Sequence, residues 1–402
     1  MNTQDFNLTN SIIYLDNAAT SLKPKQVIDS ITNYYTNYSS NPHRGDYKTA
    51  YQAGLLVEST RNKVKELLNA KSTKEIIFTS GATQSLNMIA FNYFKNILSP
   101  GDEILITSAE HASNIIPWYI LEKEIGIKVF VIPLNDNLEV IANNLLLAIT
   151  PNTKVISIAS TTNVIGDTRP IKEISKIAKE NNIYLVVDAA QSITHKKIDV
   201  QDLDIDFLAL SAHKMCGPTG IGVLYGKESL LNEMIPQNYG GGMSDNIDSN
   251  NIKLKSLPTK LEAGTQNIAG IIGFSTAIDY LNNIGFTNIE NHINKLSTYL
   301  YKKLSVIPHI NIINKNITSN IITFNVEGIF SQDISCYLDK HNICLRAGDH
   351  CAKLLKNKTN INNSCRISLY FYNTYEELDK LIELLKDKEK IIEGILWIEK
   401  YY

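Results

Sequence analysis

Long apolar runs, strong net charge and paired cysteines are all missing from this sequence. No hydrophobic stretch approaches the roughly 20 residues that a membrane-spanning helix needs, and the N-terminal ten residues lack the apolar segment of a secretion signal. The formal net charge of −2 predicts no general attraction to nucleic acid or to anionic membranes. We therefore expect no membrane partner, no nucleic-acid partner and, by default, a cytoplasmic location, although a mature organellar chain would look the same.

Cysteines are few, and their arrangement is uninformative on its own. Their number, five, is odd, and no two of them form a C-x-x-C pair. The odd count argues against a disulfide framework and the spacing against a zinc or iron–sulfur site, so we predict no metal site. The default for each thiol is a buried core side chain. The candidates for a reactive thiol are Cys216, Cys336, Cys344, Cys351 and Cys365.

Short apolar runs alternate with helical patterns from about residue 74 onward. Apolar runs typical of strands covered on both faces occur at residues 75–78, 102–107, 128–133, 154–160, 183–188 and 206–211. Helical patterns lie between them at residues 83–94, 115–124, 138–149 and 171–180. This alternation predicts an α/β fold with a mainly parallel sheet sandwiched by helices. Ligands in such folds bind beyond the carboxyl ends of the strands.

The pattern changes twice in the second half of the chain. Residues 236–265 are rich in Gly, Asn and Ser, which predicts a long loop or lid. After residue 285, strand-like runs at 321–326, 344–346 and 366–371 alternate with a helix at 331–341 and a helical tail. We therefore predict a large domain at 14–285 and a smaller α+β domain at 286–402, with residues 1–13 packing nearby.

Three segments at strand ends carry candidate chemistry. Asp188 closes an apolar strand, Lys214 follows another and precedes a glycine-rich turn, and a Gly/Ser/Thr turn at residues 79–84 links a strand to a helix. Taken singly, each has an ordinary explanation: Asp caps helices, lysines extend to the surface, and such turns are common. The three residue types together match one cofactor.

Pyridoxal phosphate (PLP) needs a lysine for its Schiff base, a carboxylate for its pyridine nitrogen and an anion-binding turn for its phosphate. Lys214, Asp188 and the turn at 79–84 supply these groups. His111 follows the strand at 102–107 and is placed to stack on the ring. A hydrogen-bonded loop histidine is the alternative interpretation of His111.

These segments resemble the class V aminotransferase-like family of PLP enzymes, which have fold type I. The similarity runs almost end to end and is strongest to the group II, Suf-type cysteine desulfurases and the related selenocysteine lyases. The motifs that carry it are Tyr14-Leu15-Asp16-Asn17-Ala18-Ala19, Asn41-Pro42-His43-Arg44-Gly45, Glu110-His111, Asp188-Ala189-Ala190-Gln191, His213-Lys214, Glu262-Ala263-Gly264-Thr265 and Arg346-Ala347-Gly348-Asp349-His350-Cys351-Ala352.

The resemblance implies a role for each matching position. Lys214 is the Schiff-base lysine, Asp188 the pyridine partner and His111 the stacking ring, and Gln191 contacts the phenolic oxygen. The residues that hold the phosphate are Ala82, Thr83, Ser211 and His213, joined by Thr265 from the other subunit of a homodimer. The residues that bind substrate are Asn163, Arg366, Arg346 and His43.

The same resemblance makes Cys351 the nucleophile. It implies that L-cysteine is converted to L-alanine with a persulfide left on Cys351, which a small Suf-type acceptor protein collects for iron–sulfur cluster assembly. Arg346 and His350 are placed to favour the reactive thiolate, whereas Asp349, where many relatives have His or Gln, would disfavour it by like-charge repulsion. The alternative is a selenocysteine lyase or another PLP β-lyase. A transaminase would leave Cys351 unexplained. A non-catalytic PLP-binding scaffold would leave the intact set of Lys214, Asp188 and Cys351 unexplained.

Overall fold

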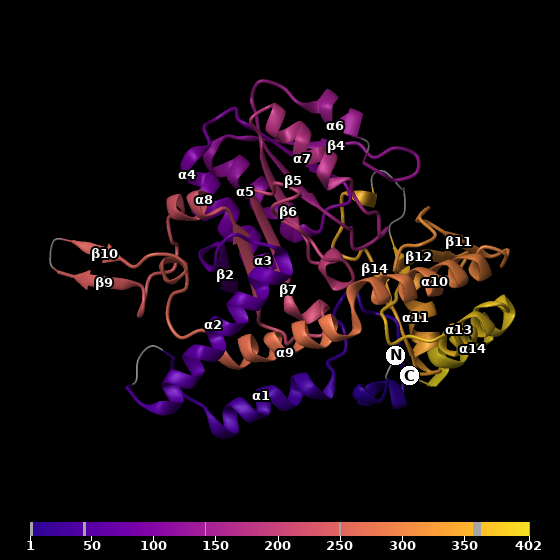
Figure 1. Cartoon of the computed structure of the whole chain (residues 1–402). Helices are drawn as coiled ribbons and strands as arrows, with labels where there is room; N and C mark the ends of the chain where they lie inside the picture. Colours follow the sequence, from indigo (N-terminus) through magenta and orange to yellow (C-terminus); the bar gives the residue numbers. More distant parts are fainter. Residues whose placement is uncertain (1–2, 43–45, 141, 249–250, 357–362, 402) are drawn as a thin grey trace.

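A seven-stranded sheet runs through the larger part of the molecule (Figure 1). The computed structural model describes residues 3–42, 46–140, 142–248, 251–356 and 363–401. The strand order is β2-β8-β7-β6-β5-β3-β4, and only β8 runs antiparallel to its neighbours. This confirms the predicted, mainly parallel sheet. The strands are β2 (Ile76–Thr79), β3 (Glu103–Thr107), β4 (Lys128–Ile132), β5 (Thr153–Ala159), β6 (Tyr184–Asp188), β7 (Phe207–Ser211) and β8 (Gly222–Gly226).

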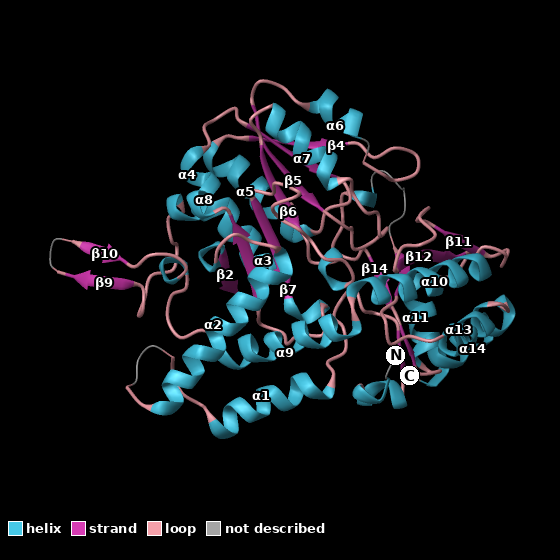
Figure 2. Ribbon diagram, viewed as in Figure 1, coloured by secondary structure: helices cyan, strands magenta, loops and turns pink. Residues whose placement is uncertain are grey.

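Helices cover both faces of this sheet, as Figure 2 shows. Alternate side chains of a strand point to opposite faces, so Leu185 and Val187 of β6 join one hydrophobic core and Val186 joins the other. The first core includes α1 (Lys25–Asn37), α2 (Lys48–Leu68), α6 (Ala142–Ala148), α7 (Ile171–Glu180) and α9 (Ile268–Ile284). The second includes α3 (Ala82–Met88), a π-helical turn (Ile89–Phe94), α5 (Ile116–Ile125) and α8 (Glu228–Glu233). The short α4 (Lys95–Ile97) follows the π-helical turn.

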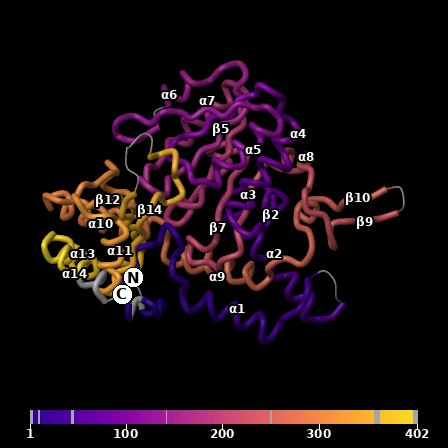
Figure 3. The backbone as a smooth tube through the Cα atoms, turned by 180° about the vertical axis from the view of Figure 1, so that it is seen from behind, coloured from indigo at the N-terminus to yellow at the C-terminus, as the bar shows by residue number. Residues whose placement is uncertain are grey.

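A third core belongs to the C-terminal region. Its antiparallel sheet has the order β11-β12-β15-β14, and a short parallel pair joins β1 (Ile13–Tyr14) to β13 (Ile343–Cys344). Both termini therefore lie on this side of the molecule (Figure 3). The division at residues 14–285 and 286–402 stays a prediction. The elements are β11 (Ile310–Ile312), β12 (Ile321–Val326), β14 (Arg346–Gly348), β15 (Ser364–Ser368), α10 (Phe286–Leu304), α11 (Ser331–Asp339), α13 (Tyr375–Leu385) and α14 (Lys388–Tyr401).

Several element boundaries differ from the sequence-based predictions. Residues 236–265 are not one continuous loop, because β9 (Ser244–Ile247) and β10 (Ile252–Leu254) pair into a hairpin that projects from the body (Figures 1 and 2). The helix predicted at 138–149 begins only at Ala142, since Leu138 has a left-handed φ of 63° that no helix continues. The helix predicted at 83–94 is α-helical only to Met88.

Strand β8 was missed by the sequence analysis because its first residue lies in a glycine-rich turn. Gly222 has no room for a side chain: a Cβ there would lie 2.5 Å from the Gly81 Cα and 2.5 Å from the Leu210 carbonyl oxygen. The glycine therefore lets the turn before α3 lie directly against the sheet.

Candidate active site

One cavity lies at the carboxyl ends of β5, β6 and β7, where the fold predicts a ligand site. Segments far apart in the sequence meet there, including Ala18 and Ala19 from the N-terminal segment. Eleven predicted site residues line this cavity, namely Ala82, Thr83, His111, Asn163, Asp188, Gln191, Ser211, His213, Lys214, Arg346 and Arg366, together with His350. Thr265 is exposed in a separate groove, where Asn41 Nδ2 donates to its hydroxyl at 3.2 Å. His43 lies outside the described residues.

Lys214 and Asp188 are the opposite charges at the floor of this cavity. Burial lowers the pKa of Lys214 to about 8, although the nearby Asp188 acts to raise it. Burial likewise raises the pKa of Asp188, opposed by the Ala190 N–H and by Lys214. The Ala190 N–H occupies Asp188 Oδ1 at 2.9 Å, and the carboxylate still faces the cavity. The site therefore offers an amine whose pKa lies close to neutral pH and a carboxylate that is buried away from water.

The turn before α3 brings together several hydrogen-bonding groups. Ala82 N–H donates to Ser211 Oγ at 2.8 Å, and the Thr83 and Ser113 hydroxyls lie 2.8 Å apart. His213 also faces this end of the cavity, and burial lowers its pKa to about 4, with Lys214 and Lys23 acting in the same direction. Hydroxyls, backbone N–H groups and a helix N-terminus in one place suit an anionic group such as a phosphate.

His111 is held in one orientation by the residues that follow it. The Ser113 N–H donates to His111 Nδ1 at 3.2 Å, which places the ring proton of a neutral imidazole on Nε2. Burial lowers the pKa of His111 to about 4, and the positive charges of Lys214, Arg346 and Arg366 act in the same direction. The ring is therefore neutral at physiological pH.

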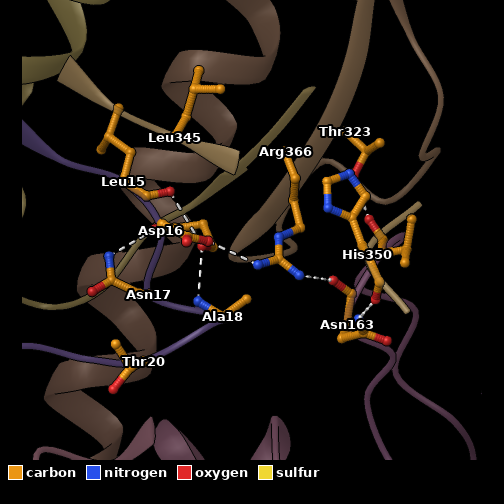
Figure 4. Close-up of polar contacts among 12 residues, drawn as sticks. Leu15, Asp16, Asn17, Ala18, Thr20, Asn163, Thr323, Leu345, His350 and Arg366 are labelled. Atoms are coloured by element: carbon orange, nitrogen blue, oxygen red, sulfur yellow. Dashed lines mark hydrogen bonds and ion pairs between the residues drawn. The ribbon is translucent and has the colours of Figure 1, made fainter. Parts of the chain in front are cut away.

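Arg366 lies between Asp16 and Asn163, as Figure 4 shows. Its Nη2 donates to Asp16 Oδ1 at 2.8 Å and its Nη1 to the Asn163 carbonyl oxygen at 2.9 Å, while its Nε has no partner among the described residues. The side-chain Oδ1 of Asn163 is also buried and unpaired there. Both members of the predicted substrate-binding pair, Asn163 and Arg366, therefore line the cavity and contact each other.

The loop that carries Cys351 is held beside the cavity by hydrogen bonds from Asn163 and Ala112. Asn163 Nδ2 donates to the His350 carbonyl oxygen at 2.6 Å, and the Ala112 N–H donates to the Cys351 carbonyl oxygen at 2.8 Å. His350 and Cys351 have φ angles of 51° and 61°, so two consecutive non-glycine residues are left-handed, which indicates local strain. Cys351 is half-exposed and does not itself line the cavity. Asp349 Oδ1 accepts the Cys351 N–H at 3.1 Å.

Comparison with known proteins places the chain in a family. The class-V aminotransferase profile matches residues 13–381. The chain belongs to the class-V aminotransferase family. It is 42% identical to a probable cysteine desulfurase of Ureaplasma parvum, over 96% of each chain. It is 43% identical to one of Borreliella burgdorferi, over 93% of this chain and 91% of the relative.

Solved structures agree with this assignment. The cysteine desulfurase of Thermococcus onnurineus superposes with a TM-score of 0.92 at 35% identity, covering 95% of this chain and 96% of that one. The cysteine desulfurase CsdA of Escherichia coli gives a TM-score of 0.91 at 34% identity, covering 99% of both chains. The fold is therefore that of fold-type-I PLP enzymes, as the resemblance predicted.

PLP is the cofactor of this family, and the residues of the cavity fit it. The cavity holds an amine, a buried carboxylate, a neutral imidazole and a cluster of anion-binding donors, which are the groups that PLP requires. No described group of three or more His, Cys, Asp or Glu side chains is arranged to hold a metal ion. No described helix is long and apolar enough to cross a membrane.

Two buried ion pairs were not predicted from the sequence, one beside His111 and one beside the groove of Thr265. Glu110, whose side chain is fully buried, accepts from Arg169 Nη1 at 3.0 Å and from the Ala159 N–H at 2.7 Å, and so fixes the residue before His111. Glu262 makes a bidentate pair with Arg61 at 2.8 and 2.9 Å. Both glutamates stood in recognised motifs, but nothing in the sequence indicated their arginine partners.

The other thiols behave as ordinary core or surface cysteines. Cys216 and Cys365 are buried, and burial raises the pKa of each to about 12. Burial also raises the pKa of the half-buried Cys344, and Cys336 is exposed on α11. These raised pKa values keep the buried thiols protonated and unreactive.

Proposed function

We propose that this chain is a PLP-dependent cysteine desulfurase that converts L-cysteine to L-alanine and leaves a persulfide on Cys351. The observation that carries the proposal is the convergence of Lys214, Asp188 and the Cys351 loop around one cavity, in a chain whose full-length relatives are named cysteine desulfurases. When bound, PLP supplies an electron sink that weakens bonds next to the α-carbon of an amino acid.

Lys214 is proposed both to hold the cofactor and to move the α-proton. Because burial lowers its pKa to about 8, the amine accepts and returns a proton near neutral pH. Asp188 is proposed to hold the pyridine nitrogen protonated. His111, neutral and oriented by Ser113, is proposed to cover the ring face without adding charge.

Substrate binding is proposed to rest on the carboxylate of L-cysteine. Arg366 and Arg346 both line the cavity, so two guanidinium groups are close to the space where a substrate carboxylate would bind. The planar guanidinium suits a carboxylate because its donors are fixed in one plane. The bridge from Asn163 to His350 then places the Cys351 loop beside the same end of the cavity.

Sulfur transfer is proposed to occur at the Cys351 thiolate. Its sulfur forms a bond to the sulfur of the substrate, and the substrate's carbon–sulfur bond breaks. The electron pair of that bond stays with the three-carbon fragment, which takes up a proton at Cβ and leaves as alanine. The half-exposed position of Cys351 leaves the resulting persulfide within reach of an acceptor.

A homodimer is proposed from the surface of α2. Tyr51 and Leu55 lie four residues apart on one face of α2, directly after the N-cap residue Tyr47. Tyr47, Tyr51 and Leu55 are 55%, 68% and 52% exposed. A continuous exposed apolar face of this kind indicates a protein interface. Thr265, which the single chain leaves exposed, would then serve the partner's phosphate site. A Suf-type sulfur acceptor and a cytoplasmic location stay predictions from the sequence.

The direct test is release of L-alanine from L-cysteine by purified protein. We expect wild-type turnover to fall at least 100-fold in Cys351→Ala, because the substrate sulfur then has no nucleophile. Cys336→Ala, on exposed Cys336, is the matched control and should keep full activity. Selenocysteine as substrate separates the alternative: a lyase would release alanine from selenocysteine regardless of Cys351. Full desulfuration of cysteine by Cys351→Ala would overturn the proposal.

A further inference from the structure

The main-chain carbonyl of His213, directly before Lys214, is held by the N-terminal segment. It accepts from the Ser21 N–H at 3.0 Å, the Thr20 hydroxyl at 3.0 Å, the Ser21 hydroxyl at 3.1 Å and Lys23 Nζ at 3.1 Å. A carbonyl oxygen has two lone pairs, so four donors on one oxygen saturate it. These four contacts hold the peptide that joins His213 to Lys214.

Lys23 supplies the only charge in this cluster of donors. Its ammonium group donates to the Thr20 hydroxyl at 2.8 Å, to the Ser21 carbonyl oxygen and to the His213 carbonyl oxygen, which uses all three of its N–H bonds. Within the described part of the chain, Lys23 forms no ion pair with a carboxylate. A partly buried ammonium without a counter-ion destabilises the fold, and burial lowers the pKa of Lys23 to about 8.

The same segment also binds the main chain on the other side of Lys214, at Cys216. The Cys216 N–H donates to Ser21 Oγ at 2.7 Å, and Cys216 has a left-handed φ of 62°. Residues 20–23 therefore bind the main chain at positions 213 and 216, on either side of Lys214. Residues 20–23 do not line the cavity, whereas Lys214 does. Residues 20–23 and residues 213–216 are separated by about half the sequence, so these hydrogen bonds are tertiary contacts and neither segment needs them to form its own local structure.

We propose that Lys23 is a positioning residue that holds the His213–Lys214 peptide and so keeps the Lys214 amine aimed into the cavity. This rests on the role proposed for Lys214. Lys23 does not line the cavity or touch substrate; it acts through the His213 carbonyl. Of the three neutral oxygens that accept from the Lys23 ammonium, only the His213 carbonyl oxygen belongs to the peptide that carries Lys214.

The test is a Lys23→Met variant of the holoenzyme, which keeps the side-chain stem and removes the ammonium. We expect kcat for L-cysteine to fall at least tenfold with KM changed less than threefold, because proton transfer by Lys214 is disturbed and carboxylate binding is not. We also expect amide hydrogen exchange in residues 212–217 to accelerate about tenfold, with exchange in β6 unchanged. Lys25→Met, at an exposed lysine in the same segment, is the matched control and should behave as wild type.

Two further variants keep the result interpretable. Lys23→Arg restores a donor and should recover most of the lost kcat. Thr20→Val removes one donor to His213 and one acceptor of the Lys23 ammonium while leaving the Lys23–His213 contact, and should shift kcat and local exchange in the same direction by a smaller factor. The inference is wrong if Lys23→Met exchanges at the wild-type rate in residues 212–217, or if its loss appears in KM alone. Failure of the wild type to desulfurate cysteine would instead refute the proposed function and leave the exchange result standing.

Discussion

At the scale of single residues, the site is defined by what burial does to charged groups. Lys214 has a lowered pKa and Asp188 a raised one, both because burial disfavours charge. Asp188 opposes the shift of Lys214, and the Ala190 N–H, followed by Lys214, opposes the shift of Asp188. Arg366 is likewise buried, which lowers its pKa, and the Asp16 carboxylate acts in the opposite direction. Arg366 is therefore kept charged in the cavity with the help of Asp16, and removal of Asp16 should affect substrate binding before it affects the chemical step.

The Asp16–Arg366 pair gives the residue-scale prediction. In Asp16→Asn, Arg366 loses its anionic partner while keeping a neutral acceptor, so its guanidinium is less firmly oriented toward the substrate carboxylate. We expect KM for L-cysteine to rise at least tenfold and kcat to change less than threefold in steady-state kinetics. Asp29→Asn, which breaks only the exposed pair with Lys25, should leave both constants unchanged. An unchanged KM in Asp16→Asn would show that Arg366 does not bind the carboxylate.

At the scale of elements, the sequence predicted what is local and missed what is long-range. Strands β6 and β7 were predictable because their residues are continuously apolar and buried on both faces. The hairpin β9–β10 was not, since its strands are only four and three residues long and mostly exposed. Asp16 was quoted within a motif, but its pairing with Arg366 spans 350 positions, and no local pattern encodes such a contact.

The exposed face of α2 gives the element-scale prediction. Tyr51→Glu places a charge in the middle of the proposed interface, where no water would remain to solvate it. We expect light scattering to give about 90 kDa for the wild type, two chains of 45.0 kDa, and the mass of one chain for the variant. Val306→Glu, at a 75% exposed position just after α10, is the control and should stay dimeric. A monomeric wild type would remove the support for Thr265 acting across subunits.

At the scale of the whole molecule, buried histidines tie stability to pH. Burial, aided by Lys196, lowers the pKa of His195 to about 3, against an ordinary value of 6.5 in the unfolded chain. Between these values the unfolded state binds more protons than the folded one, so stability is complete above about pH 6.5 and falls as the pH is lowered toward 3. His350 follows the same rule, because burial and two arginines lower its pKa to about 3.

This linkage gives the whole-molecule prediction. One such histidine should cost roughly 2 kcal/mol of unfolding free energy between pH 7 and pH 5. We therefore expect the urea midpoint of the wild type to fall over this range, and His195→Gln to show a smaller fall. His341→Gln, at an exposed position, should keep the full wild-type pH dependence. An equal fall in His195→Gln and wild type would show that His195 titrates normally in the folded protein.

The central claim is that sulfur passes from L-cysteine to Cys351 at the cavity of Lys214 and Asp188. Mass spectrometry of the peptide that contains Cys351, after incubation with L-cysteine and without reductant, tests it most directly. We expect one added sulfur atom on Cys351 in the wild type and none in Lys214→Ala or on the peptide of Cys336. Alanine released in stoichiometric amount with no sulfur on Cys351 would contradict it.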